Sequence, residues 1–172
     1  ISMNSRGCPL TEAEQIKPLL FKELNSDDSR WSYGKKWDEW ENTFFKMAGK
    51  NRDISSIDKA MRMMIRTVIE LEKTTQRDRL NPSEDAKLVK LATIESYMDV
   101  IESLSQDYKK EVERLFGDSN SDARLYVLKA LIIEKKRGRN DARELQRIAK
   151  IVENGLRRGT MEHLPLLKFL KA

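Results

Sequence analysis

The stretch SSIDKAMRMMIRTVIELEKTT, residues 55–75, decides the fold class of this chain. Its apolar residues recur at alternating intervals of four and three, at Ile57, Met61, Met64, Val68 and Leu71. Ile65 and Ile69 lie beside this stripe and widen it. This spacing is the period of an α-helix with one apolar face. The sequence therefore predicts a long, deeply packed helix over 55–75.

A second long helix is predicted over 83–104. The dipeptide Asn81-Pro82 breaks the preceding pattern, Ser83 is placed to cap a new helix, and two acidic residues follow at the positive end of its dipole. The apolar stripe then repeats at Leu88, Leu91, Ile94, Met98 and Ile101. We expect the helices over 55–75 and 83–104 to form the central hairpin of the fold.

An aromatic helix is predicted over 35–48, with Gly49 as its stop signal. Its apolar residues lie at intervals of three, four and three: Trp37, Trp40, Phe44 and Met47. Tryptophans could also form an exposed stacking platform, but at this spacing beside a phenylalanine they are typical of a core. We therefore expect this helix to anchor the interior.

The segment before the aromatic helix is predicted to hold one helix and one loop. Thr11 and Glu14 have the spacing of a capping box, and Pro18 is expected to restart the helix one turn later. The inward residues would be Leu19, Leu20, Phe21 and Leu24. Residues 25–34 then form a predicted polar loop, in which Ser26 to Ser29 is the best candidate for a flexible segment.

Further helical patterns follow at 105–116, 122–137 and 141–158, and a short last one is interrupted by Pro165. The fold class is therefore all-α: a single-domain multi-helix bundle of about seven helices with short loops. Residues 1–10 are expected to be disordered or tag-derived. Residues 11–172 are expected to form a single helical domain, with 123–172 as a basic C-terminal subregion.

Composition excludes several classes of protein. Hydrophobic residues make up 39% of the chain and charged residues 35%, and no apolar run approaches the roughly 20 residues that span a bilayer. No signal-peptide pattern is present at the start, and the single cysteine, Cys8, cannot form an internal disulfide. We expect a soluble protein of the cytoplasm or nucleus, a reducing compartment, with no membrane partner.

The residue inventory also argues against catalysis. One histidine, His163, and one cysteine stand at opposite ends of the chain, so converging zinc or catalytic ligands are not available. The glycines are isolated helix stops rather than a phosphate-binding cluster. Pairs of glutamates two residues apart, Glu70 with Glu72 and Glu111 with Glu113, are interpreted as solvated charge. We therefore predict no enzyme activity, no cofactor and no metal.

The charge distribution is the most informative feature of the sequence. Residues 1–122 hold 20 lysines and arginines against 23 acidic residues, a net charge of −3, whereas residues 123–172 hold 13 against 5, a net charge of +8. The predicted nucleic-acid-binding residues are nine of these 13 cations: Lys135, Lys136, Arg137, Arg139, Arg143, Arg147, Lys150, Arg157 and Arg158. Such a concentration of positive charge attracts polyanions.

Routine helix termination explains part of this set, since the helix dipole favours cations at Lys135 to Arg137 and at Arg157 and Arg158. It does not explain Arg143, Arg147 and Lys150, which lie nearer the start or middle of their predicted helix and share its outward face. We therefore interpret the chain as a helical module that binds RNA or DNA, an accessory subunit of a replication, transcription or packaging assembly.

The alternative is a scaffold or adaptor domain that binds an acidic protein partner through the C-terminal helices and the aromatic helix. The apolar segment 164–170 either completes the core or anchors the chain in a groove of such a partner. A homo-oligomer stays open as well, because a wide apolar stripe such as that of 61–71 serves a dimer interface as well as a core.

Overall fold

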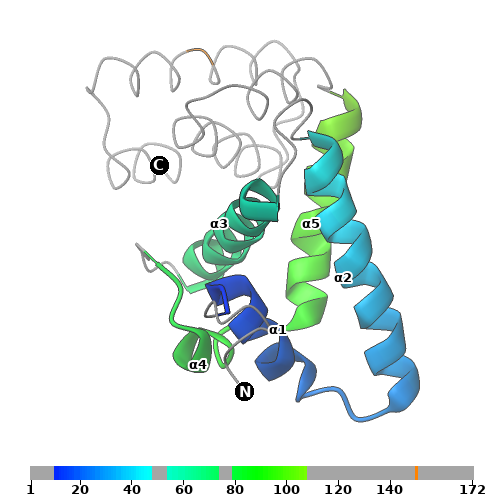
Figure 1. The fold of residues 1–172 in the computed structure, drawn as a ribbon, viewed down its shortest axis with the longest axis vertical. Helices are drawn as coiled ribbons and strands as arrows, with labels where there is room; N and C mark the ends of the chain where they lie inside the picture. Colours follow the sequence, from blue (N-terminus) through cyan, green and yellow to red (C-terminus); the bar gives the residue numbers. More distant parts are fainter. Residues whose placement is uncertain (1–9, 48–53, 74–78, 108–149, 151–172) are drawn as a thin grey trace. The chain divides into compact units, whose positions relative to one another are not determined.

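A computed structural model of the chain describes residues 10–47, 54–73, 79–107 and 150 (Figure 1). The regular elements in these ranges are all helices: α1 (Glu12–Phe21), α2 (Asp27–Met47), α3 (Ile54–Lys73), α4 (Pro82–Asp85) and α5 (Leu91–Asp107). The all-α prediction is confirmed for this part of the chain. The N-terminal residues 1–9 and most of the predicted helices after residue 107 lie outside the described residues, so the count of about seven helices stays a prediction.

The contacts divide the chain into two compact units. The described part of the first unit comprises α1, α3, α4, α2 as far as Phe45 and α5 as far as Ser96. Within it, α1 lies against α3 and α4, as Figure 1 shows. The second unit holds the last two residues of α2 and α5 from Tyr97 onward, and its buried side chains include Met98, Ile101 and Leu104.

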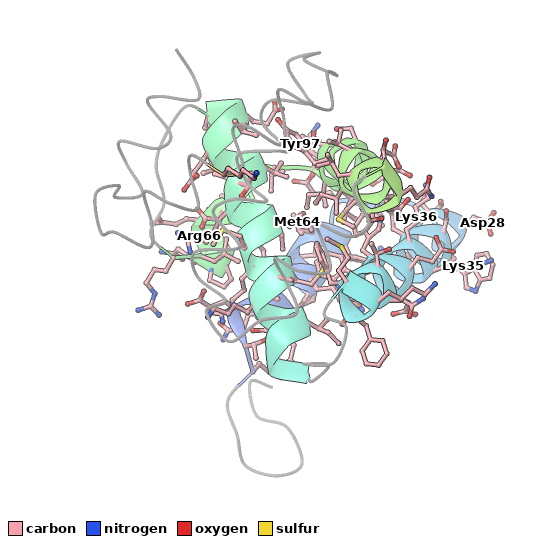
Figure 2. All side chains as sticks on the ribbon, turned by 90° about the horizontal axis from the view of Figure 1, so that it is seen from above. Asp28, Lys35, Lys36, Met64, Arg66 and Tyr97 are labelled. Carbon is pink, nitrogen blue, oxygen red and sulfur yellow. The ribbon has the colours of Figure 1, made fainter. Side chains whose placement is uncertain are left out.

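The prediction for α3 is confirmed almost to the residue. The stripe is buried at Met61, Met64, Ile65, Val68 and Ile69, and Figure 2 shows Met64 pointing from α3 into the space between the helices. The ends of the stripe, Ile57 and Leu71, are half-buried. The spacing succeeds here because one broad apolar face fixes both the period and the orientation of the helix.

The interpretation of Glu70 as solvated charge is wrong, although Glu72 is exposed as expected. Thr67, Val68, Ile69 and Glu70 are all buried, so a complete turn of α3 is enclosed by protein. Side-chain spacing within one helix says which residues share a face, but it does not say how many faces neighbouring elements cover. Glu111 and Glu113 lie outside the described residues.

The predicted polar loop over 25–34 is also wrong, because α2 begins at Asp27 and runs through Gly34. Ser26 caps the helix: its Oγ accepts a hydrogen bond of 3.1 Å from the backbone N–H of Ser29. Asp27 and Asp28 then occupy the first turn, where the helix dipole favours negative charge. The residues that suggested a flexible loop are thus a helix start.

In α1 the capping box is confirmed, with the Thr11 Oγ1 accepting from the Glu14 N–H and the Glu14 carboxylate accepting from the Thr11 N–H. The expected restart at Pro18 is wrong, because Pro18 lies inside one continuous helix and its carbonyl accepts from the Lys22 N–H. Leu20 is buried as predicted, whereas three of the residues expected to point inward are only half-buried: Leu19, Phe21 and Leu24.

The predicted helix over 83–104 is two helices. After α4 the chain forms a turn with hydrogen bonds between residues three apart. The Lys87 N–H donates to the Glu84 carbonyl, and the Leu88 N–H donates to the Asp85 carbonyl. Val89 and Leu91 are both buried. Residues 89 and 90 are not helical, and residues two apart face the same side of an extended segment, so Val89 and Leu91 can both point into the core. From Leu91 the predicted stripe is confirmed, with Ile94, Met98 and Ile101 buried.

Candidate functional site

One of the nine predicted nucleic-acid-binding residues, Lys150, lies within the described part of the chain. It is helical and exposed, as its predicted place on an outward helix face requires. The others lie outside the described residues: Lys135, Lys136, Arg137, Arg139, Arg143, Arg147, Arg157 and Arg158. The local geometry of a site therefore comes from the helices α1 to α5.

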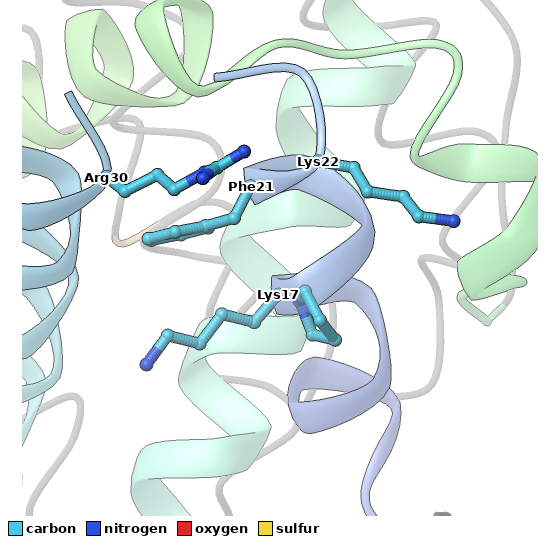
Figure 3. A pocket seen from close by; sticks show the side chains of 5 residues that line it. Lys17, Phe21, Lys22 and Arg30 are labelled. Atoms are coloured by element: carbon cyan, nitrogen blue, oxygen red, sulfur yellow. The ribbon is translucent and has the colours of Figure 1, made fainter. Parts of the chain in front are cut away.

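A shallow pocket of about 450 Å³ opens where α1 meets the start of α2 (Figure 3). Five residues line it: Lys17, Pro18, Phe21, Lys22 and Arg30. Three of these five side chains are cationic and none is a carboxylate. Lys17 lies in α1 and Lys22 is its C-cap residue. The cap at Ser26 begins α2, so Arg30 lies in the first turns of that helix.

An aromatic contact holds the two helices together beside this pocket. The rings of Phe21 and Trp37 meet edge to face, with their centroids 6.1 Å apart. The Lys17 ammonium lies 5.8 Å from the Phe21 centroid and 5.7 Å from that of Trp37, within the range of a cation–π interaction. In Figure 3 the side chains of Lys17 and Arg30 run along opposite sides of the Phe21 ring. The pocket is thus built on a packed aromatic base.

Trp31 stands apart from the other two tryptophans. Trp37 and Trp40 are each 3% exposed, which confirms their predicted place in the core, but Trp31 is 71% exposed. The Lys35 ammonium lies 5.5 Å from the centroid of its ring, and Figure 2 shows Lys35 pointing outward from α2. Sequence reasoning missed this side chain because it placed residue 31 in a loop. Once α2 is extended to Asp27, the separation of nine positions between Trp31 and Trp40 places them on opposite faces.

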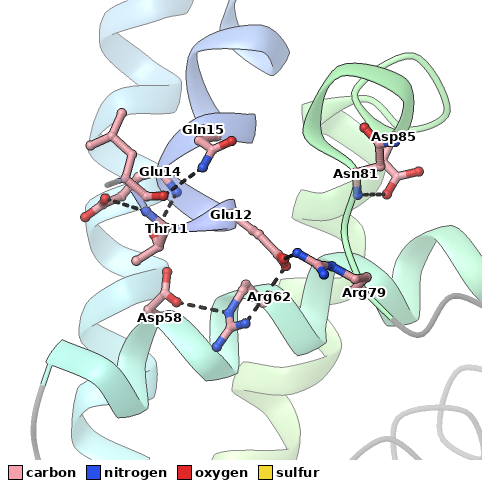
Figure 4. A network of polar contacts seen from close by, with 10 residues as sticks. Thr11, Glu12, Glu14, Gln15, Asp58, Arg62, Arg79, Asn81 and Asp85 are labelled. Atoms are coloured by element: carbon pink, nitrogen blue, oxygen red, sulfur yellow. Dashed lines mark hydrogen bonds and ion pairs between the residues drawn. The ribbon is translucent and has the colours of Figure 1, made fainter. Parts of the chain in front are cut away.

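A second polar cluster joins α1 to its neighbours (Figure 4). The Glu12 carboxylate pairs with the Arg79 guanidinium at 3.2 Å and with that of Arg62 at 3.9 Å, and the Nε of Arg62 lies 3.0 Å from an oxygen of Asp58. Glu12 also occupies the first turn of α1, where its charge is favoured by the dipole. Charges of both signs alternate through this cluster, so we interpret it as a structural clasp.

A third polar cluster connects α2 with the start of α5. Glu95 accepts a hydrogen bond of 3.3 Å from the Tyr33 hydroxyl and pairs with the Lys36 ammonium at 2.5 Å. Burial, together with the negative charge of Glu95, raises the pKa of Tyr33 above its ordinary value. A phenol kept protonated in this way donates to the carboxylate, which is again a structural role.

Within the ranges 10–47, 54–73 and 79–107 no group of three or more potential ligands is gathered that could hold a metal ion. None of the described helices is both long enough and apolar enough to cross a membrane. The chain matches no protein-family model, no curated protein sequence and no solved structure.

Proposed function

We propose that this protein binds RNA or DNA through electrostatic contacts of its basic C-terminal segment, residues 123–172. It would act without enzyme activity, as an accessory subunit of a replication, transcription or packaging assembly. The charge distribution carries the proposal. Residues 10–47, 54–73 and 79–107 hold 13 lysines and arginines against 17 acidic residues, a net charge of −4, whereas the segment 123–172 holds 13 against 5, a net charge of +8.

A segment of this charge gains affinity for nucleic acid chiefly by releasing counterions from the phosphates that it contacts. Arg143, Arg147 and Lys150 lie nearer the start or middle of their predicted helix, where the helix dipole does not account for cations. The exposure of Lys150 is compatible with a phosphate contact. Binding of this kind is independent of base sequence and falls steeply as salt is added.

A triple variant tests the proposal: Arg143→Gln, Arg147→Gln and Lys150→Gln. A matched control makes three changes at exposed positions of the described part of the chain, with the same loss of charge: Lys46→Gln in α2, and Lys87→Gln and Lys90→Gln between α4 and α5. Because only the first set removes the proposed phosphate contacts, it should weaken binding of labelled duplex DNA or RNA about tenfold or more at low salt. Fluorescence anisotropy measures the affinity, and circular dichroism verifies that both variants stay helical.

Equal losses in the two triple variants would mean that net charge matters and the proposed residues do not. Salt-sensitive binding of polyglutamate, without binding of RNA or DNA, would instead favour the alternative function of an adaptor for an acidic protein. That second outcome would overturn the proposal, and the charge of the segment 123–172 would then explain the binding of the acidic protein.

A further inference from the structure

The exposed indole of Trp31 is the feature that the electrostatic proposal leaves unexplained. Its 71% exposure contrasts with 3% for Trp37 and Trp40 and exceeds the 38% of Phe45, the other large exposed apolar side chain among the described residues. A tryptophan in this position adds nothing to a core. Exposed aromatic rings flanked by cations are instead a recurring means of holding unpaired bases.

Trp31 directly follows Arg30, which lines the pocket between α1 and α2. A step of one residue turns the side-chain direction by about 100° around a helix, so the indole lies on the outer side of α2, next to the rim of the pocket. We define the α1–α2 surface as the residues Lys17, Lys22, Arg30, Trp31 and Lys35. It combines one exposed aromatic ring with four cations.

Charge alone does not make this surface a site for polyanions. Glu23, Asp27 and Asp28 lie in the same stretch of chain, and Asp27 pairs with Arg30 at 3.5 Å. That pair is weak, because the Asp27 side chain is fully exposed and that of Arg30 is about half exposed, so water and salt screen it. A phosphate can therefore replace Asp27, but the specificity of the surface must come from the ring.

We infer that the α1–α2 surface binds single-stranded nucleic acid, with an unpaired base stacked on Trp31 and neighbouring phosphates held by Arg30, Lys22 and Lys35. The inference rests on the proposed function and goes beyond it by adding a second contact surface, specific for single strands. A convex helix face cannot insert an indole into an intact duplex at low cost, since the bases there are already stacked and paired. A single strand offers free base faces, and stacking on them is tolerant of sequence.

The closing experiment compares three single variants with the full-length protein: Trp31→Ala, Trp31→Phe and Phe45→Ala. Labelled oligothymidine and a labelled duplex are titrated by fluorescence anisotropy. Loss of one stacked base should reduce oligothymidine affinity roughly 5- to 150-fold in Trp31→Ala. Duplex affinity should stay the same, Trp31→Phe should retain most of the single-strand affinity, and Phe45→Ala should behave as the unmodified protein.

Intrinsic fluorescence supplies a second readout. Since Trp37 and Trp40 are buried, quenching by oligothymidine should come from Trp31 and should disappear in Trp31→Ala. Unchanged oligothymidine affinity in Trp31→Ala, alongside weaker duplex binding in the Arg143, Arg147 and Lys150 variant, would overturn this inference and leave the proposed function standing. Failure of the unmodified protein to bind either probe at low salt would overturn both.

Discussion

At the scale of single residues, burial separates side chains of the same type. Trp37 and Trp31 lie on one helix, yet the first is part of the core and the second is open to solvent. Apolar spacing identified Trp37 correctly, because it falls in register with Trp40 and the other core residues of α2. Trp31 and the buried Glu70 could not be placed from spacing alone, since their environment depends on where α2 begins and on how many sides of α3 are covered.

Glu41 gives a prediction at this scale. Burial raises the pKa of its carboxyl group above the ordinary value, and Asp38 and Glu14 add to that effect while Lys17 opposes it. A raised folded-state pKa means that folding favours the protonated form. The contribution of this group to stability is therefore complete below its unfolded-state pKa and is lost as the pH rises through the folded-state value.

Glu41→Gln removes this charge and should stabilise the protein at neutral pH by about 0.5 kcal/mol or less, since the group is only half-buried. The gain should shrink as the pH falls below the ordinary range of a glutamate. Urea unfolding of both proteins at neutral and acidic pH measures it, with Glu39→Gln as an exposed control on the same helix. A gain that grows toward acidic pH would contradict this account of Glu41.

At the scale of helices, the sequence predicted apolar faces better than it predicted ends. Helix α3 and the stripe of α5 were correct because a broad apolar face depends only on spacing. The start of α2 was missed because serines and aspartates are typical of both loops and helix starts. The break between α4 and α5 was missed because no glycine or proline marks residues 86–90, and Leu88 and Leu91 keep the spacing of a helix.

The cap of α2 is directly testable. Ser26→Ala removes the side-chain oxygen that accepts from the Ser29 N–H, and it should cost about 1 kcal/mol of unfolding free energy. Ser32→Ala, in the interior of the same helix, is the matched control and should be neutral or slightly stabilising, because alanine is the better helix former. Chemical denaturation measures the free energy of unfolding of both variants. Equal changes in the two would show that Ser26 does not cap the helix.

At the scale of the whole molecule, the sequence supplies a contrast of charge that the described helices sharpen. Residues 10–47, 54–73 and 79–107 have a net charge of −4, and the segment 123–172 has a net charge of +8, which is why we propose that the segment attracts polyanions. The candidate site on α1 and α2 could not be predicted from the sequence. Lys17, Lys22 and Arg30 line one pocket only because α1 packs beside α2. We therefore propose two modes of contact with nucleic acid, one governed by charge and one by stacking.

The dependence of duplex binding on salt tests the central claim most directly. With five or six phosphate contacts, a plot of log K against log salt concentration should be linear with a slope of about −5. The variant with glutamine at positions 143, 147 and 150 should have a slope about 3 units less steep, because each lost contact removes about 0.9. No binding at low salt, or a slope near zero in the unmodified protein, would contradict the account.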